Sequence, residues 1–342
     1  MTALAAWPRA GYLPVVPPAP EDDTAPAPGE GDPGEPGPAW ATIPDGTGIN
    51  QILGVGNRLI LAHGGYVGGS HHVATVDTAT RQPQSGPLVP TEGFSTAHHI
   101  DGVVYLTWND PTGAWNAPQG YSYSTDGGET WREKRVAPSY HFYDMCKHDG
   151  ALFLAGSGPA PDGTPRGIVW RSDDAGATWV ESLSVAGADL VRVYYLAEYG
   201  GALRCAPRNA SPATTYRWDQ GHWTEEAPSR LTSLTKIRLG CHGLSAGGCY
   251  YGPENALTPD GQLLAYDGDR RTPAWSDGQH VYAVNLPAGK IDRTPLGLAD
   301  WAPWLDLGEG MTGHVATCAA LHDGWVYVGG TQGRIWRYPA PT

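Results

Sequence analysis

HIDGVVYLT, at residues 99–107, is an Asp-Gly turn between two apolar stretches, and copies of this pattern recur to the end of the chain. The turn glycines of the copies are Gly56, Gly102, Gly150, Gly201, Gly247, Gly278 and Gly324. A glycine there supplies the positive φ that a tight hairpin needs. Most copies follow the previous one by 46 to 51 residues, a spacing typical of a β-propeller with one four-stranded blade per repeat. The sequence therefore predicts an all-β fold, a β-propeller of seven blades, or of six because the 31-residue interval after Gly247 is short for a blade.

The two ends of the repeat region look like parts of one blade. GRIWRYPAP (333–341) is similar to a third strand such as GIVWRSD (167–173), but no fourth strand follows it. PAWATIP (38–44) is similar to fourth strands such as HWTEEAP (222–228). We therefore expect the residues around Trp40 to form the outer strand of the last blade. Such closure removes the exposed sheet edges that invite aggregation.

The chain divides into an N-terminal arm, residues 1–39, and the propeller, residues 40–342. Residues 17–39 hold eight prolines, six acidic residues and no basic residue, so we expect an extended linker. Three Gly-X-Y triplets at its end are too few to hold a collagen triple helix. Ahead of the linker, a short apolar peptide is either a disordered terminus or a docking peptide that binds a larger assembly. Its candidate docking residues are Trp7, Tyr12, Leu13, Val15 and Val16.

Two segments, STDGGETW (124–131) and SDDAGATW (172–179), share the pattern S-x-D-x-G-x-T-W, which we call Asp box 1 and Asp box 2. In each, the aspartate can cap backbone N–H groups and the glycine can take a left-handed step, while the tryptophan packs between blades. We expect a structural role for both, in turns on the face opposite the binding face, rather than calcium binding or catalysis. A third, worn copy lies at 214–223. The structural residues are Ser124, Asp126, Gly128, Trp131, Ser172, Asp174, Gly176 and Trp179.

The Asp boxes make residues 40–341 resemble the sialidase-like (BNR) propellers. That family also carries an early Arg-Ile-Pro motif and three arginines that bind a carboxylate, and this chain has no Arg-Ile-Pro motif. Glycosidases need a pair of carboxyl groups. Glu92, Asp144, Glu198 and Glu254 are present, but the sequence does not pair them. We therefore expect no enzymatic activity and no cofactor, with a sialidase-like glycoside hydrolase or another glycan-active enzyme as the alternative.

In a propeller, the loops between the second and third strands of each blade (the 2–3 loops) lie on the same face as the starts of the innermost strands. We expect ligands to bind on this face. The loops here are long and aromatic, and the segments 139–144, 191–195 and 235–238 are expected to begin innermost strands. Aromatic rings with a few fixed polar groups are typical of sugar sites, although the same residues could simply line the channel. The candidate ligand-binding residues are Tyr66, Trp108, Trp115, Tyr121, Tyr140, His141, Tyr143, Asp144, Arg192, Tyr194, Lys236 and Arg238.

Several classes of function are disfavoured. A net charge of −13 argues against nucleic-acid binding. The chain contains no apolar run long enough for a membrane span, and its first residues lack the features of a signal peptide. The histidines of each pair, at 71–72 and 98–99, are adjacent on a strand, so their side chains point to opposite faces of the sheet. We therefore expect neither pair to bind a metal ion. The five cysteines are expected to be buried thiols, although Cys241 and Cys249 could form a disulfide across one hairpin.

Taken together, a propeller with two Asp boxes, a proline-rich N-terminal arm and no signal peptide resembles the minor tail proteins of actinobacterial phages. The resemblance implies a virion protein of the phage tail, made in the host cytoplasm. It also implies that the arm binds other tail proteins and that the loop face binds a host cell-envelope glycan or surface protein.

Overall fold

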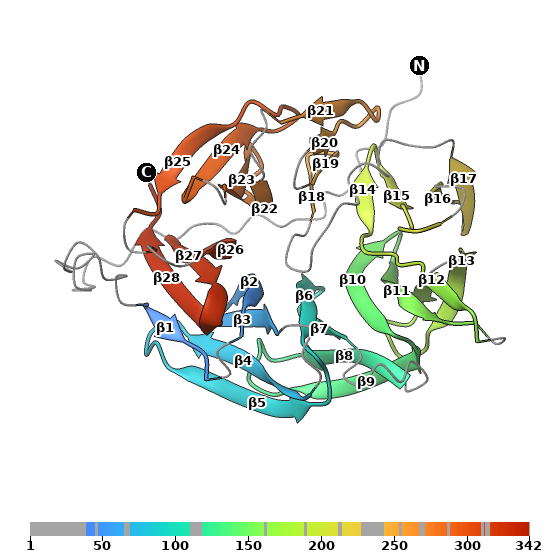
Figure 1. Ribbon diagram of the computed structural model, residues 1–342, viewed down its shortest axis with the longest axis horizontal. Helices are drawn as coiled ribbons and strands as arrows, with labels where there is room; N and C mark the ends of the chain where they lie inside the picture. The colour runs from blue at the N-terminus through green and yellow to red at the C-terminus, as the bar shows by residue number, and fades with distance from the viewer. Residues whose placement is uncertain are drawn as a thin grey trace, which may run out of the picture.

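The protein is a ring of seven four-stranded antiparallel sheets around a common axis (Figure 1). The computed structural model describes residues 39–341 apart from 45–46, 65–68, 110–117, 161–162, 188–189, 211–213, 227–242, 253–254, 267–270, 286–287, 309–310 and 312–314. The all-β, seven-bladed propeller expected from the repeats is confirmed. The predicted docking peptide (Trp7, Tyr12, Leu13, Val15 and Val16) lies outside the described residues and stays a prediction.

From the axis outward, the first three blades are β2 (Ile49–Val55), β3 (Arg58–His63), β4 (His71–Asp77), β5 (Pro83–Val89); β6 (Phe94–Ile100), β7 (Val103–Trp108), β8 (Pro118–Ser124), β9 (Arg132–Pro138); β10 (His141–His148), β11 (Ala151–Pro159), β12 (Pro165–Ser172), β13 (Val180–Ala186). Blades 4 and 5 are β14 (Ala197–Tyr199), β15 (Ala202–Cys205), β16 (Thr215–Asp219), β17 (His222–Glu226); β18 (Leu244–Ala246), β19 (Cys249–Tyr251), β20 (Asn255–Leu257), β21 (Leu263–Ala265). Blades 6 and 7 are β22 (Arg271–Ser276), β23 (His280–Asn285), β24 (Lys290–Pro295), β25 (Ala302–Asp306); β26 (Ala316–His322), β27 (Trp325–Gly330), β28 (Arg334–Pro339), β1 (Ala41–Thr42), with a 3-10 turn at Thr331–Gly333.

Burial within a blade explains the sequence pattern of its strands. The second strands are buried on both faces, because neighbouring blades cover both sides; along β11 every residue but the last is buried. Such strands read as continuous apolar runs rather than as alternating ones. The outer strands are less buried and carry more polar residues; in β13 only one residue is buried and the others are exposed or half-buried.

The short interval after Gly247 holds a complete blade after all. Each strand of blade 5, from β18 to β21, has only three residues. Short strands and a two-residue turn at Gly247–Gly248, both with positive φ, fit four strands into the interval. The six-bladed alternative is therefore wrong.

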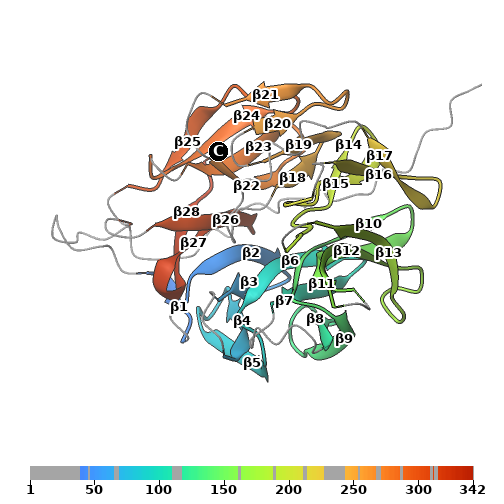
Figure 2. The ribbon, with the colours of Figure 1, turned by 45° about the vertical axis from the view of Figure 1, so that its right-hand side comes forward.

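The ring closes as the sequence predicts. Ala41 pairs with Ile335 and Thr42 with Arg334, which places β1 outside β28 in blade 7 (Figures 1 and 2). The Ile43 N–H continues the pairing by donating to the Gly333 carbonyl over 2.9 Å. Trp40 is half-buried and contacts the ring of Tyr327 edge-on, with 5.1 Å between ring centroids.

The two Asp boxes form matching hydrogen-bonded turns between the third and fourth strands of blades 2 and 3. In box 2, the Gly176 N–H donates to the Ser172 hydroxyl over 2.8 Å. The Thr178 N–H and hydroxyl donate to the two Asp174 oxygens over 2.8 and 2.6 Å. Box 1 repeats these bonds from Ser124, Asp126 and Thr130.

The worn third copy has lost this turn but kept its tryptophan. β16 and β17 are joined by a two-residue turn, Gln220–Gly221, with both residues at positive φ. Trp223 still packs between blades 3 and 4, with 6.0 Å between its centroid and that of Phe153. The tryptophan therefore serves the packing between blades independently of the aspartate.

Ring closure can be tested at Ile43, which is 1% exposed and packs with Ile49 and Ile335. We expect Ile43→Ala to lower the free energy of unfolding by about 2–5 kcal/mol, because it leaves a cavity at the seam. Thr42→Ala, at the exposed last residue of β1 just before Ile43, is the matched control and should change it by less than about 0.5 kcal/mol. Urea unfolding measures both; equal effects would mean that this strand does not close the ring.

The Asp-box turns predict an acid-sensitive contribution to stability. Hydrogen bonds from Thr178, then from Ser172, lower the pKa of Asp174 to about 2, and those from Thr130 lower the pKa of Asp126. A lowered pKa stabilises the fold above the unfolded value of 3.8, and this stabilisation is lost as the pH falls through the folded value. Asp174→Asn should lower the melting temperature at neutral pH, and the difference from the wild type should shrink toward pH 2.

The neighbouring Asp173→Asn is the control for this prediction, because Asp173 is exposed and forms an ion pair with Arg171. It should change the melting temperature less than Asp174→Asn. A difference between the Asp174→Asn variant and the wild type that is independent of pH would contradict the assignment.

Candidate functional site

The innermost strands share a backbone irregularity near their starts, on the face that also carries the 2–3 loops. The register of five of them shifts at a β-bulge, at residues 49–51, 94–97, 142–144, 273–275 and 316–318. A bulge turns a side chain out of the regular alternation. The bulged residues can therefore point along the ring, toward the next blade.

Polar side chains at the bulges join neighbouring blades. The Thr317 hydroxyl donates to the Ile49 carbonyl, from blade 7 to blade 1. Asn50 Nδ2 donates to the Phe94 carbonyl over 3.0 Å, and Gln51 Oε1 accepts from the Ala97 N–H over 2.9 Å, both from blade 1 to blade 2. These bonds link the backbone of one blade to a side chain of its neighbour.

Asp144 makes the corresponding link from blade 3. One of its oxygens accepts from the Leu196 N–H, in the segment that precedes β14, over 2.9 Å. The other accepts from the Met145 N–H over 2.9 Å and lies 3.2 Å from His98 Nε2 on β6. Asp144 therefore holds three blades together.

Beside Asp144 lies a group of aromatic and charged residues that we call the channel-mouth cluster: Glu92, His98, His141, Tyr143, Asp144, Arg192 and Tyr194. His141 Nε2 lies 3.4 Å from Glu92 Oε1, and the His141 ring lies 5.5 Å from that of Tyr143. The Tyr143 and Tyr194 centroids are 4.5 Å apart. The structure thus brings together five of the predicted ligand-binding residues: His141, Tyr143, Asp144, Arg192 and Tyr194.

Exposure differs within the cluster. Tyr143 is 4% exposed, and burial raises the pKa of its hydroxyl, an effect that the nearby Arg192 partly opposes. Tyr194, Arg192 and His141 are only half-buried. Tyr194 and Arg192 are therefore the predicted residues that a ligand can reach most directly. The buried Tyr143 ring packs against the ring of Tyr194.

Three other predicted residues are too buried to form a binding platform. Trp108 is fully buried between blades 1 and 2; its Nε1 donates to Ser122 and Arg135 stacks on its ring. Tyr121 is 2% exposed and lies between blades 2 and 3. Tyr140, also 2% exposed, is held where β10 begins. The sequence pattern placed these rings next to loops, but each belongs to the core.

The remaining predicted ligand-binding residues, Tyr66, Trp115, Lys236 and Arg238, lie outside the described residues, as do Glu254 and Cys241. Segment 191–195 was expected to begin an innermost strand. It instead precedes β14 and makes a single bridge, between Arg192 and Arg208. Of the three basic residues among the predicted ligand-binding residues, Arg192, Lys236 and Arg238, the described part of the chain contains Arg192.

Sequence reasoning missed the pairing of Glu92 with His141, the link from Asp144 to Leu196, and the roles of Asn50 and Gln51. The bulges that create these contacts leave no clear signal in the sequence. A polar residue among the first four positions of an innermost strand, as Asn50, Gln51 and Asp144 are, is the feature that could have found those three.

Within the described residues, no group of three or more His, Cys, Asp and Glu side chains is arranged to bind a metal ion. Cys146, Cys205, Cys249 and Cys318 are free thiols, and burial raises the pKa of each. The part of the chain that the structure describes contains no helix with the length and hydropathy of a membrane span.

Comparison with known proteins gives the fold more support than the function. No family model matches the chain. A xyloglucanase of Hypocrea jecorina (strain QM6a) is 30% identical over 127 residues, which cover 31% of this chain and 15% of the xyloglucanase. The chain thus matches only a small part of this relative's length.

Solved structures that resemble the protein are similar in fold at low sequence identity. A streptogramin B lyase superposes with a TM-score of 0.54 and 13% identity, covering 86% of this chain and 94% of the lyase. The propeller domain of the Trilobed protease from Pyrococcus furiosus gives 0.52 and 10%, covering 86% of this chain and 96% of that domain. These likenesses show a β-propeller and nothing about its ligand.

A pH-dependent contact lies at the other end of β10. His148 is 8% exposed and lies 3.7 Å from Glu198 of blade 4 and 3.5 Å from Asp149. The contact with Glu198 raises the His148 pKa above 6.5, against the effect of burial. A raised histidine pKa stabilises the fold below the unfolded value, and this stabilisation is lost as the pH rises through the folded value.

We therefore expect Glu198→Gln to lower the free energy of unfolding at about pH 5.5, and to have less effect at about pH 8.5. Glu198 is half exposed, so the loss should be about 0.2–1 kcal/mol. Denaturant unfolding at the two pH values measures it. A larger loss at the higher pH would show that the protonated imidazole is not the partner of Glu198.

Proposed function

We propose that this chain is a non-enzymatic, glycan-binding propeller that serves as a minor tail protein in a phage virion. The observation that carries the binding part is the channel-mouth cluster, in which Tyr194 and Arg192 lie half-buried on the loop face. A half-buried ring supported by a second ring, with fixed polar groups beside it, suits a sugar. Arg192 also provides a local positive charge on a protein of net charge −13, which would attract an acidic glycan.

The contacts of the two carboxyl groups in the cluster favour binding over hydrolysis. Both oxygens of Asp144 accept hydrogen bonds from backbone N–H groups. A general acid or base must exchange its proton with the substrate, whereas Asp144 is committed to holding blades together. Glu92 is similarly engaged with His141.

A glycan-active hydrolase is the second candidate, and the similarity to a xyloglucanase is the observation that favours it. The two candidate functions differ in whether sugar is released from the polysaccharide. A hydrolase would release reducing sugar from xyloglucan or from host-envelope polysaccharide, and Asp144→Asn or Glu254→Gln would abolish the release. The proposed binder would bind the polysaccharide and release nothing.

The virion assignment rests on the resemblance in overall organisation, above all the proline-rich arm ahead of the propeller. It predicts that a protein lacking residues 1–39 still folds, because β1 begins at Ala41, but no longer joins tail particles. Mass spectrometry of purified particles from a phage carrying the deletion would measure incorporation. Normal incorporation would remove the role of the arm, and absence of the full-length protein from wild-type particles would overturn the virion assignment.

The binding surface is tested at its two accessible residues. We expect Arg192→Ala and Tyr194→Ala each to weaken binding to host-envelope polysaccharide about tenfold or more, equivalent to ~1.4 kcal/mol. Lys290→Ala, a change of a partly exposed basic residue on blade 6, should leave binding unchanged and serves as the control. Sedimentation of the protein with purified cell envelopes measures affinity. Unchanged binding in both loop-face variants would show that the glycan binds elsewhere.

A further inference from the structure

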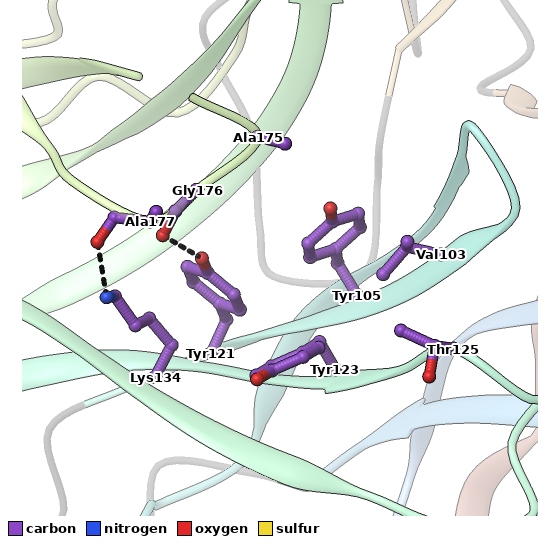
Figure 3. A pocket seen from close by; sticks show the side chains of 9 residues that line it. All are labelled: Val103, Tyr105, Tyr121, Tyr123, Thr125, Lys134, Ala175, Gly176 and Ala177. Atoms are coloured by element: carbon purple, nitrogen blue, oxygen red, sulfur yellow. Dashed lines mark hydrogen bonds between the residues drawn. The ribbon is translucent and has the colours of Figure 1, made fainter. Parts of the chain in front are cut away.

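A hollow of about 270 Å³ lies in the seam between blades 2 and 3, on the face that carries the Asp boxes. Three tyrosines of blade 2, Tyr105, Tyr121 and Tyr123, line it together with Lys134 (Figure 3). The turn 175–177 of Asp box 2, in blade 3, forms the opposite wall. The hollow thus lies between two blades, on the face opposite the channel-mouth cluster.

Strand register explains why these side chains meet. Tyr105 on β7 pairs with Tyr123 on β8, and Tyr121 on β8 pairs with Lys134 on β9. Residues that pair, or that lie two apart on one strand, share a face of the sheet. All four side chains therefore extend from blade 2 toward blade 3.

The matching place in the seam between blades 1 and 2 is closed. Ile60 and Thr75 pair where blade 2 has Tyr105 and Tyr123. Arg58, on the same strand as Ile60, forms an ion pair with Glu129 of Asp box 1 over 3.7 Å. At the position of Glu129, Asp box 2 has Ala177, whose side chain cannot reach across the seam.

The seam between blades 3 and 4 is closed in another way. Phe153 is the third residue of β11, the position that Tyr105 occupies in β7. It packs against two tryptophans of blade 4. Its ring centroid is 5.0 Å from that of Trp218 and 6.0 Å from that of Trp223. Of these three equivalent seams, the one between blades 2 and 3 alone is lined by tyrosines and faced by alanines and a glycine.

Part of the hollow is fixed and part is free to bind. The Tyr121 hydroxyl is held by Trp179 Nε1 over 3.3 Å, and Lys134 Nζ donates to the Ala177 carbonyl over 2.6 Å. Among the described residues, neither the Tyr105 nor the Tyr123 hydroxyl has a hydrogen-bond partner. The hollow thus combines aromatic walls that are held in place with two phenol groups that can donate and accept.

We propose that this hollow binds one neutral hexopyranose unit of a glycan. The C–H face of a pyranose ring would pack against the ring of Tyr123, which is half-buried, whereas Tyr105 and Tyr121 are buried. Its hydroxyl groups would bond to Tyr105, Tyr123 and a remaining donor of Lys134. The volume is below the roughly 300–1,000 Å³ that larger ligands occupy, so a single ring is expected to enter while the rest of the chain stays outside.

Charge favours a neutral sugar here. Burial raises the pKa of Tyr105, and the nearby carboxylate of Asp101 raises it further. Asp174 similarly adds to the larger effect of burial on the Tyr121 pKa. Asp101 and Asp174 together outnumber the basic residue in the described lining of the hollow, Lys134, so they disfavour a sialic or uronic acid. This site therefore differs in preference from the channel-mouth cluster and does not depend on the function proposed for that cluster.

The test measures binding of cellotetraose, maltotetraose, mannotetraose and a xyloglucan heptasaccharide to the full chain by saturation-transfer NMR and calorimetry. We expect at least one of them to bind, with transfer concentrated on a single sugar ring. Ala177→Glu, which introduces the residue found at this place in Asp box 1, should raise the Kd tenfold or more. Tyr105→Phe, which removes one hydroxyl, should raise it at least threefold.

Glu129→Ala is the matched control, because it changes the same turn position in the other seam. It should leave the Kd unchanged, and melting temperatures of all variants check that they fold. Failure of all four oligosaccharides to bind at millimolar concentration would overturn the proposal, as would binding that is unaffected by Ala177→Glu. Preferential binding of N-acetyltyrosinamide would overturn it in favour of an aromatic peptide.

A further variant separates this proposal from the function proposed above. Arg192→Ala should leave binding of these oligosaccharides unchanged. If Arg192→Ala abolishes it and Ala177→Glu does not, the sugars bind at the channel-mouth cluster, and the proposed hollow is rejected while the recognition function is retained. If Ala177→Glu alone abolishes it, the hollow binds sugar whether or not the chain belongs to a virion.

Discussion

Each blade is a separate hydrogen-bonded sheet, so the integrity of the ring depends on what side chains place between the blades. Two kinds of contact fill this role. Aromatic and aliphatic side chains pack in the seams, as Phe142 and Trp170 do beside Tyr105 and Tyr121. Nearer the axis, polar side chains at the bulges bond to the backbone of the next blade. Apolar packing is non-directional, so it holds neighbouring blades together without setting their orientation. Hydrogen bonds are directional, so the bonds at the bulges fix the angle between neighbouring blades.

This division also explains where the protein can accommodate a ligand. A seam that is fully packed leaves no room for a ligand. A bulge whose polar side chain is already hydrogen-bonded has no free group with which to bind one. The channel-mouth cluster arises where the segment 191–195, which precedes β14, brings Arg192 and Tyr194 beside the bulge at 142–144, and both remain half-buried. The hollow between blades 2 and 3 arises where small residues of a turn meet large residues of a sheet. Both candidate sites are places where the contacts between blades leave side chains accessible or space unfilled.

Much of the architecture could be predicted from the sequence because it depends on local signals. Turn glycines with positive φ, such as Gly102 and Gly324, mark each hairpin, and a missing fourth strand at the C-terminus predicts the closing role of residues near Trp40. The candidate site was less predictable. Trp108 and Tyr121 adjoin a loop in sequence, but the register of β7 and β8 turns them into the core. Whether a ring faces a seam or solvent depends on pairing between strands, and on bulges such as that at Tyr143, which residue types alone do not reveal.

β1 contributes two residues to blade 7 and is the first strand that the structure describes. A pulling force applied at Trp40 would reach the Ala41 and Thr42 pairs, the Ile43 hydrogen bond and the contact of Trp40 with Tyr327 first. Detachment of β1 would leave blade 7 with three strands while the other six blades kept four, and the Thr317 hydroxyl would still link blade 7 to blade 1.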